Sequence, residues 1–273
     1  MTAKAKNGAW NALPAMSRAQ KLLPGFNGHT LFPRQFRRRN ARFAKDKPMI
    51  SVIVPAHNEE RYLRETLRSL EQQRYSRYEV IVVANGCSDA TAAVARKHCD
   101  RLIVISQKGI SLSRNLGARM ARGDILVFVD ADTILQPDAL KIISRQFTPE
   151  YAAGTLRAKP EPARWFYLLL YFFKNLMHWS RLHKGSVGVI LCWKKHFEAE
   201  GGFDEGLHVM ENSALIEKLQ KHGKYRFVNN TIATTSMRRY EKKGFRRTVG
   251  LWVKLWLRSL TGDLHHRGYE TVR

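Results

Sequence analysis

The chain has 273 residues, 44% of them hydrophobic, so it is long enough to bury a sizeable core as one large domain or as one domain with appendages. With 47 Lys and Arg against 23 Asp and Glu, its formal charge is +24, which favours polyanionic partners such as nucleic acid, anionic lipid or phosphorylated substrates. Three widely spaced cysteines fit neither a disulfide framework nor a zinc pattern and indicate a reducing compartment. We expect no secretory signal and no membrane-spanning helix, since no apolar run approaches the roughly 18 residues that a span requires.

Residues 1–47 form a basic N-terminal arm, in which eleven Lys and Arg accompany a single acid, Asp46. Scattered Pro and Gly argue against one long helix. We expect a solvated, partly disordered tail, and binding to anionic lipid is one role for it.

From residue 49 the sequence alternates regularly. Apolar runs at 50–54, 80–84, 102–105 and 125–129 predict strands, and helical patterns follow the first three, at 59–70, 90–97 and 113–121. Asn58 is the predicted N-cap of the first helix. Four strands in alternation with helices predict an α/β domain with a largely parallel central sheet.

Polar residues gather where these strands end. Asn58 and Glu59 follow the first strand, residues 85–89 the second, and Asp130 and Asp132 the fourth. Ligands of parallel sheets bind at this edge. The glycine-rich dinucleotide and P-loop motifs are absent from the sequence, which weakens both of those interpretations.

Asp130 and Asp132 lie two positions apart, so in an extended chain both carboxylates face the same side. Two adjacent carboxylates favour a bound cation, and oxygen-only ligation favours Mg²⁺ or Mn²⁺. The alternative is a surface turn that carries two solvated aspartates.

Residues 49 to about 250 resemble the family 2 glycosyltransferases, the inverting nucleotide-sugar enzymes of bacterial type with the GT-A fold. Six elements carry the resemblance, and they are residues 50–60, 85–91, 108–117 (Lys108-Gly109 and Ser113 to Gly117), 130–132, 201–205 and 235–248. The resemblance implies a GT-A domain over residues 48–235, followed by a basic amphipathic C-terminal segment over 236–273.

The resemblance also implies roles for individual residues. Asp132 would ligate Mn²⁺ or Mg²⁺ on the donor diphosphate, and Asp130 would contact the ribose or the metal. Arg238 and Arg239 would clamp the diphosphate, although they also fit a solvated basic surface. The remaining substrate contacts would be Pro55, Ala56, Asn58, Glu59, Asn85, Asp89, Lys108, Arg114 and, on the acceptor side, Asp204.

Two positions depart from the family pattern. Ala84 replaces an aspartate that often reads the donor base, and the acceptor helix has Glu211-Asn212 where the family has Glu-Asp. Asparagine cannot accept a proton at neutral pH. Three explanations stay open: Glu211 serves as the base, the acceptor is an ionised phosphate such as polyprenyl phosphate, or the chain binds donor without turnover. The predicted catalytic positions are Glu211, Asn212 and Asp132.

Residues 165–173 are uninterrupted apolar residues, six of them aromatic, and the pattern continues to Trp179. This segment is either a buried core helix or a helix at the lipid interface, where flanking Arg and Lys suit the head groups. Residues 249–260 add an amphipathic basic pattern. Together with the arm, they predict a peripheral protein on the cytoplasmic, anionic face of a membrane.

The sequence therefore predicts a metal-dependent glycosyltransferase of the hexosyl type. It would move a sugar, with inversion, from a nucleotide-sugar donor to a lipid-linked or glycan acceptor of the cell envelope. A degenerate donor-binding protein is the alternative. A nucleic-acid-binding protein is disfavoured because carboxylates at the strand ends would repel a phosphate backbone. Donor base, sugar and oligomeric state stay undetermined.

Overall fold

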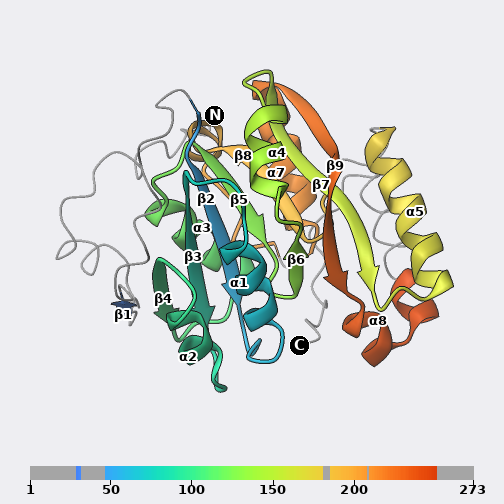
Figure 1. Ribbon diagram of the computed structural model, residues 1–273, viewed down its shortest axis with the longest axis horizontal. Helices are drawn as coiled ribbons and strands as arrows, with labels where there is room; N and C mark the ends of the chain where they lie inside the picture. Colours follow the sequence, from blue (N-terminus) through green and yellow to red (C-terminus); the bar gives the residue numbers. More distant parts are fainter. Residues whose placement is uncertain (1–28, 32–46, 181–184, 208, 251–273) are drawn as a thin grey trace, which may run out of the picture.

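The computed structural model describes residues 29–31, 47–180, 185–207 and 209–250. One nine-stranded sheet, in the order β1-β4-β3-β2-β5-β8-β7-β9-β6, runs through the molecule (Figure 1). The strands are β1 (His29–Leu31), β2 (Ile50–Ala56), β3 (Tyr78–Asn85), β4 (Arg101–Ile105), β5 (Ile125–Val129), β6 (Thr133–Leu135), β7 (Tyr151–Glu161), β8 (Val189–Trp193) and β9 (Lys224–Ser236). The helices are α1 (Leu63–Glu71), α2 (Thr91–Arg96), α3 (Ile110–Met120), α4 (Ala139–Gln146), α5 (Trp165–Trp179), α6 (Lys194–Ala199), α7 (Glu211–Leu219) and α8 (Arg238–Lys243), with a 3₁₀ turn at Gln220–His222.

The four predicted strands are confirmed as β2, β3, β4 and β5, which are mutually parallel. Every residue of β2, β3 and β5 is buried, as expected for strands that are covered on both faces. Their carboxyl ends therefore share one edge of the sheet. The α/β fold class is confirmed.

The other half of the sheet has strands that the sequence pattern did not predict. Strand β8 runs antiparallel to both β5 and β7, β9 runs parallel to β7, and β6 pairs antiparallel with β9. In β7 the exposed residues Arg157, Lys159 and Glu161 alternate with buried ones, so this strand lacks the continuous apolar run that marks a doubly covered strand.

Helices cover both faces of the sheet. Helices α1, α2 and α4 pack on one face, against a core that includes Val52, Val80 and Val127. Helices α3, α6 and α7 pack on the other, against Ile53, Val83 and Phe128. Each strand thus contributes alternate residues to two cores.

A smaller core joins α5 and α8 at the far side of β7, to the right in Figure 1. Its buried residues are Ala158, Tyr167, Tyr171, Met237 and Tyr240. The opposite side of α5 is exposed and apolar. The sequence left two interpretations of this segment open, and the helix buries one face while exposing the other.

One local prediction is wrong. Helix α1 begins at Leu63, after a turn in which the N–H groups of Tyr62 and Leu63 donate to the Glu59 carbonyl. Asn58 is therefore not its N-cap, and it adopts a left-handed φ of 53°. Asn is one of the few residues that tolerate this conformation, and the turn is shaped by the neighbouring loop instead of by the helix.

The ends of the chain are described only in part. Within the predicted basic arm, β1 pairs antiparallel with β4, and the rest of the arm up to residue 46 lies outside the described residues. Residues 251–273, which include most of the predicted C-terminal amphipathic pattern, lie outside them as well. Within the described ranges, every helix is too short or too polar to traverse a bilayer.

Candidate active site

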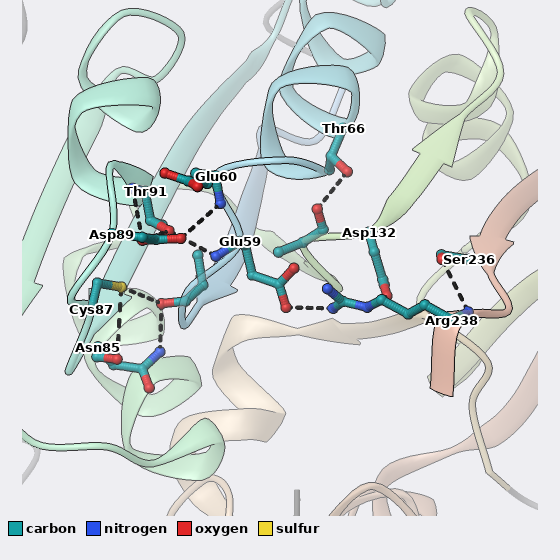
Figure 2. A network of polar contacts seen from close by, with 12 residues as sticks. Glu59, Glu60, Thr66, Asn85, Cys87, Asp89, Thr91, Asp132, Ser236 and Arg238 are labelled. Carbon is teal, nitrogen blue, oxygen red and sulfur yellow. Dashed lines mark hydrogen bonds and ion pairs between the residues drawn. The ribbon is translucent and has the colours of Figure 1, made fainter. Parts of the chain in front are cut away.

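The loops after β2 and β3 are tied together by their own polar side chains (Figure 2). Asn58 Oδ1 accepts the N–H of Ser88 at 2.9 Å, and Asp89 Oδ2 accepts the N–H of Glu60 at 3.2 Å. The other Asp89 oxygen accepts both the N–H and the hydroxyl of Thr91. Burial raises the pKa of Asp89, but these hydrogen bonds outweigh burial and leave the pKa below its ordinary value. The site thus keeps Asp89 ionised.

Asn85, at the end of β3, is buried and uses both ends of its amide within the protein. It donates to the Ala56 carbonyl at 2.9 Å and accepts the N–H of Gly109 at 3.3 Å. Pro55 and Ala56 are the last two residues of β2 and are buried beside it. These contacts give Asn85 a positioning role for the loop ends, and its predicted contact with substrate stays a prediction.

Asp130 and Asp132 lie just past β5, in a turn instead of an extended segment. Strand β5 ends at Val129, and the Thr133 N–H donates to the Asp130 carbonyl at 3.0 Å. The extended-chain reason for their proximity therefore does not apply, but the turn still keeps them close. The turn is held from α1, because the Thr66 hydroxyl donates to the Ala131 carbonyl at 2.8 Å.

Asp132 forms an ion pair with Arg238, the first residue of α8. Arg238 Nε lies 3.1 Å from Asp132 Oδ2, and Arg238 Nη2 donates to Glu59 Oε1 at 2.5 Å (Figure 2). The guanidinium also covers the Tyr62 ring, 4.5 Å from its centroid. Burial raises the pKa of Asp132 to about 6; Arg238 and Arg239 act to lower it, whereas Asp130 and Glu59 act to raise it further.

The chemistry of these oxygens fits a hard divalent cation. Glu59 is only 3% exposed, and its second carboxylate oxygen, Oε2, is buried with no hydrogen-bond partner. Asp130, Asp132 and Glu59 offer oxygen ligands only, which suits Mg²⁺ or Mn²⁺. Among the described residues no group of three or more His, Cys, Asp or Glu is arranged to hold an ion alone. Substrate phosphates would therefore complete the shell, as is usual for these ions.

Arg114, on α3, joins the two carboxylate positions of the site. Its Nη2 lies 3.0 Å from Asp130 Oδ1, while Nη1 lies 3.1 Å from Glu211 Oε1 and donates to Asn212 Oδ1 at 2.6 Å. The side chain is 3% exposed and lies over the Phe203 ring, 5.0 Å from its centroid. Arg114 thus fixes the start of α7 relative to the Asp130 turn, and its predicted contact with phosphate or base stays a prediction.

The acceptor-side segment is anchored by the neighbour of Arg114. Asn115 accepts the Phe203 N–H and donates to the Phe203 carbonyl and to Glu205 Oε1, all within 2.9 Å. A Cβ on Gly202, whose φ is +77°, would lie 2.7 Å from Asn115 Oδ1, so glycine is required at this close approach. Asp204 is exposed beside it.

The remaining predicted contacts are Lys108 and Arg239. Lys108 is exposed on the loop after β4. Arg239 lies close enough to Asp132 to act on its pKa. The sequence analysis did not identify Tyr62, Thr66 and Phe203 as residues that contact the site. The two rings contact arginines from other elements, Tyr62 with Arg238 and Phe203 with Arg114, so no local sequence pattern marks them.

The parallel strand ends, the paired aspartates and the two arginines that bind them, Arg114 and Arg238, fit an α/β protein of the GT-A fold class. The model of the family described as Glycosyl transferase family 2 matches residues 51–203, more than half of the chain. The chain therefore belongs to glycosyl transferase family 2.

Relatives agree with this assignment. The chain is 26% identical to the glycosyltransferase GlyA of Streptococcus pneumoniae over 244 residues, which is 80% of this chain and 34% of GlyA. It is 35% identical to the putative glycosyltransferase EpsH of Bacillus subtilis over 98 residues, 34% of this chain and 28% of EpsH. The chain thus spans about a third of the length of these curated relatives.

Solved structures share the fold. One is the mannosyltransferase PcManGT of Pyrobaculum calidifontis in complex with GDP-Man and Mn²⁺, with a TM-score of 0.59 and 20% identity over 70% of this chain and 57% of PcManGT. Another is TarS 1–349 of S. aureus in complex with UDP-GlcNAc, with a TM-score of 0.57 and 21% identity over 68% of this chain and 58% of that chain. At this identity, the likeness defines the fold alone.

Proposed function

We propose that this protein transfers a sugar, with inversion and with the help of Mn²⁺ or Mg²⁺, from a nucleotide-sugar donor to an acceptor phosphate carried by a polyprenyl lipid. One observation carries the proposal: at the carboxyl edge of the parallel strands, Arg238 binds both Glu59 and Asp132, and Arg114 binds the neighbouring Asp130. The bound GDP-Man and Mn²⁺ of PcManGT and the bound UDP-GlcNAc of TarS support the donor class and the ion.

On the donor side, the loops after β2 and β3, which carry Asn58, Glu59 and Asp89, would receive the nucleoside. The hydrogen bonds between these two loops are already formed, so little ordering is needed when a donor binds. Asp132, with Asp130, would hold the divalent ion. When bound, that ion supplies Lewis-acid stabilisation of the departing diphosphate. Arg238 and Arg239 would contact the diphosphate from α8.

The acceptor side explains the choice of a phosphate. The amide of Asn212 cannot take a proton, and Glu211 already lies in an ion pair with Arg114. An ionised phosphate needs no base. Its oxygen would bond to the anomeric carbon while the bond from that carbon to the diphosphate breaks, and the electron pair would leave with the nucleoside diphosphate.

A glycan hydroxyl is the second acceptor class, and it would require Glu211 to leave Arg114 and accept the hydroxyl proton. A protein that binds donor without turnover is the third reading, favoured by Asn212 alone. The ion pair of Glu211 with Arg114 argues against a glycan acceptor. The presence of Asp130 and Asp132 argues against a protein that binds donor without turnover.

We also place the protein on the cytoplasmic face of a membrane, at its surface. Three free cysteines support a reducing compartment, and the +24 charge supports contact with anionic lipid. A polyprenyl phosphate would be met at this surface.

The test is transfer from UDP-, GDP- and dTDP-sugars to polyprenyl phosphate in vesicles, with Mn²⁺, Mg²⁺ or EDTA. We expect turnover that needs the ion and falls about 10³-fold in Asp132→Ala. Asp138→Ala, which removes a half-buried aspartate paired with Arg74, is the matched control and should keep full activity. Nucleotide binding without turnover under every condition would leave only the degenerate binder.

A second variant separates the acceptor classes. Glu211→Gln should retain most transfer to polyprenyl phosphate, since no proton has to be removed. With a glycan acceptor and Glu211 as base, the same change should lower turnover by about 10²-fold or more. That loss, seen with polyprenyl phosphate as the acceptor, would overturn the phosphate proposal.

A further inference from the structure

Helix α5 exposes a continuous apolar stripe along its whole length. Seven large apolar side chains are on this face, from Trp165, which is 76% exposed, to Trp179, which is 65% exposed; the others are Leu168, Leu169, Phe172, Phe173 and Leu176. Their spacing of three and four residues places them on one side of the helix. An exposed apolar stripe of this kind is typical of a surface that contacts a protein partner or a membrane.

The opposite face of α5 is already packed, so the stripe is not a core face that lacks its partner within the described chain. Tyr167 and Tyr171 are buried in the small core with Tyr240 of α8. Asn175 exchanges two hydrogen bonds with the backbone of Ala158 on β7, at 2.9 and 3.0 Å. These contacts fix which side of α5 faces outward, at the edge of the molecule in Figure 1.

Basic residues lie beside the N-terminal end of the stripe. Arg164 directly precedes α5, and the chain just after α8 returns to this end, where Phe245 packs on Phe166 at 5.1 Å between ring centroids. Lys242, Arg246 and Arg247 are exposed there. Glu241, which lies 3.9 Å from Arg164, is the acid closest to them in sequence. The apolar stripe therefore has a cationic border.

We propose that this face of α5 docks on an anionic lipid bilayer, with the helix lying in the interface and its apolar side chains at the acyl boundary. This proposal rests on the proposed function and names the surface that meets the membrane. Tryptophans at both ends and cations at one border match the head-group region and its negative charge. A two-fold contact in which the two α5 helices ran parallel would instead bring the two cationic borders together, which opposes that arrangement.

Docking through α5 would place the membrane close to the catalytic carboxylates. Lys174 of α5 donates to the Tyr240 hydroxyl at 2.9 Å, and α8 begins with Arg238, which contacts both Glu59 and Asp132. Two packed helices thus separate the docked face from the site.

The experiment is flotation of the full-length chain with vesicles of phosphatidylcholine, alone or mixed with phosphatidylglycerol, and without donor or acceptor. We expect binding that is stronger to the anionic vesicles and weakened about tenfold or more by Phe172→Ser with Phe173→Ser, because binding scales with the apolar area inserted. Ile134→Ser removes an exposed aliphatic side chain from β6, away from α5, and is the matched control. Its vesicle binding should equal that of the wild type.

Three results would overturn the proposal: equal binding by the double variant, equal binding to both vesicle types, or a wild-type dimer in light scattering that the double variant converts to a monomer. Nucleotide binding by the double variant serves as the check on folding. Because vesicle binding is measured without turnover, failure of this proposal is distinguishable from failure of sugar transfer, which is tested with the Asp132 variant.

Discussion

Two regions of this molecule are held together in different ways. The parallel half, with β2, β3 and β5 at its centre, has two cores, one on each face of the sheet, and every residue of these three strands is buried. The α5–α8 layer has five buried core residues and an exposed apolar face on α5.

The difference indicates which region gives the site its rigid support and which region is able to move when a ligand or a membrane binds. The parallel half needs no ligand to cover its apolar surface, so it forms the rigid support of the site. The α5–α8 layer reaches that site through Arg238, and a single guanidinium contacts both Glu59 and Asp132. A layer with a small core and a direct contact to the site is the part that a donor or a membrane is able to shift.

The largest expected effect is on the main core. Phe128 is buried, with its ring centroid 5.4 Å from that of Phe197 and 5.1 Å from that of Phe203. Phe128→Ala should lower the free energy of unfolding by about 3–5 kcal/mol, measured by urea denaturation followed by circular dichroism. Phe173→Ala, on the exposed face of α5, is the control and should change it by less than about 0.5 kcal/mol. Equal losses would show that the two regions share one core.

The next effect tests the link between α3 and α7. Arg114→Met leaves Glu211 and Asp130 without their shared partner, so we expect turnover to fall about 10²-fold, equivalent to about 3 kcal/mol. Single-turnover transfer measures it. Arg119→Met, at an exposed position of the same helix, should leave turnover unchanged. Full activity of Arg114→Met would remove Arg114 from the catalytic arrangement.

A third prediction concerns the pH dependence of folding. Since burial raises the pKa of Asp132 to about 6, the folded protein binds this proton more tightly than the unfolded chain. The stability contributed by this group is therefore present at low pH and is lost as pH rises from about 4 to about 6. Asp132→Asn cannot titrate and has no such loss. We therefore compare the unfolding free energy of Asp132→Asn with that of the wild type, and expect the difference, variant minus wild type, to be about 2 kcal/mol larger at pH 7 than at pH 4.

Urea unfolding in EDTA at both pH values measures this difference. Asp138→Asn, at a half-buried position outside the site, is the control, and its change in unfolding free energy should be the same at each pH. A gain for Asp132→Asn that is independent of pH would contradict the raised pKa.

The smallest effect lies within the α5–α8 layer. Tyr240→Phe removes the hydroxyl that accepts from Lys174, at an expected cost of about 1 kcal/mol. Hydrogen exchange should accelerate in α5 and α8 and stay unchanged in β2 and β3. In contrast, Tyr78→Phe, which removes a bond to the Leu70 carbonyl in the main core, should lower global stability. Faster exchange throughout the sheet in Tyr240→Phe would show that the layer is not separate.

Much of the parallel half was predictable from the sequence. Its strands are doubly covered, so each is a short uninterrupted apolar run, and the polar residues that follow each strand mark the ligand edge. The short motifs around Asn58, Asp89 and Asp132 were found for the same reason: the residues of each motif are neighbours in the chain. The start of α1 was misplaced, because the turn at Asn58 is bonded to the loop after β3 instead of capping the helix.

The amino-acid sequence by itself determined the α/β class, the positions of the parallel strands along the chain and the carboxylates at their ends, since all of these depend on local patterns. Only the tertiary structure decided the partners of those carboxylates. Arg114 meets Glu211 across 97 positions and Arg238 meets Glu59 across 179. It also decided which face of α5 is buried, because an almost wholly apolar helix has no polar stripe to orient it, and only packing against β7 and α8 selects the outward side.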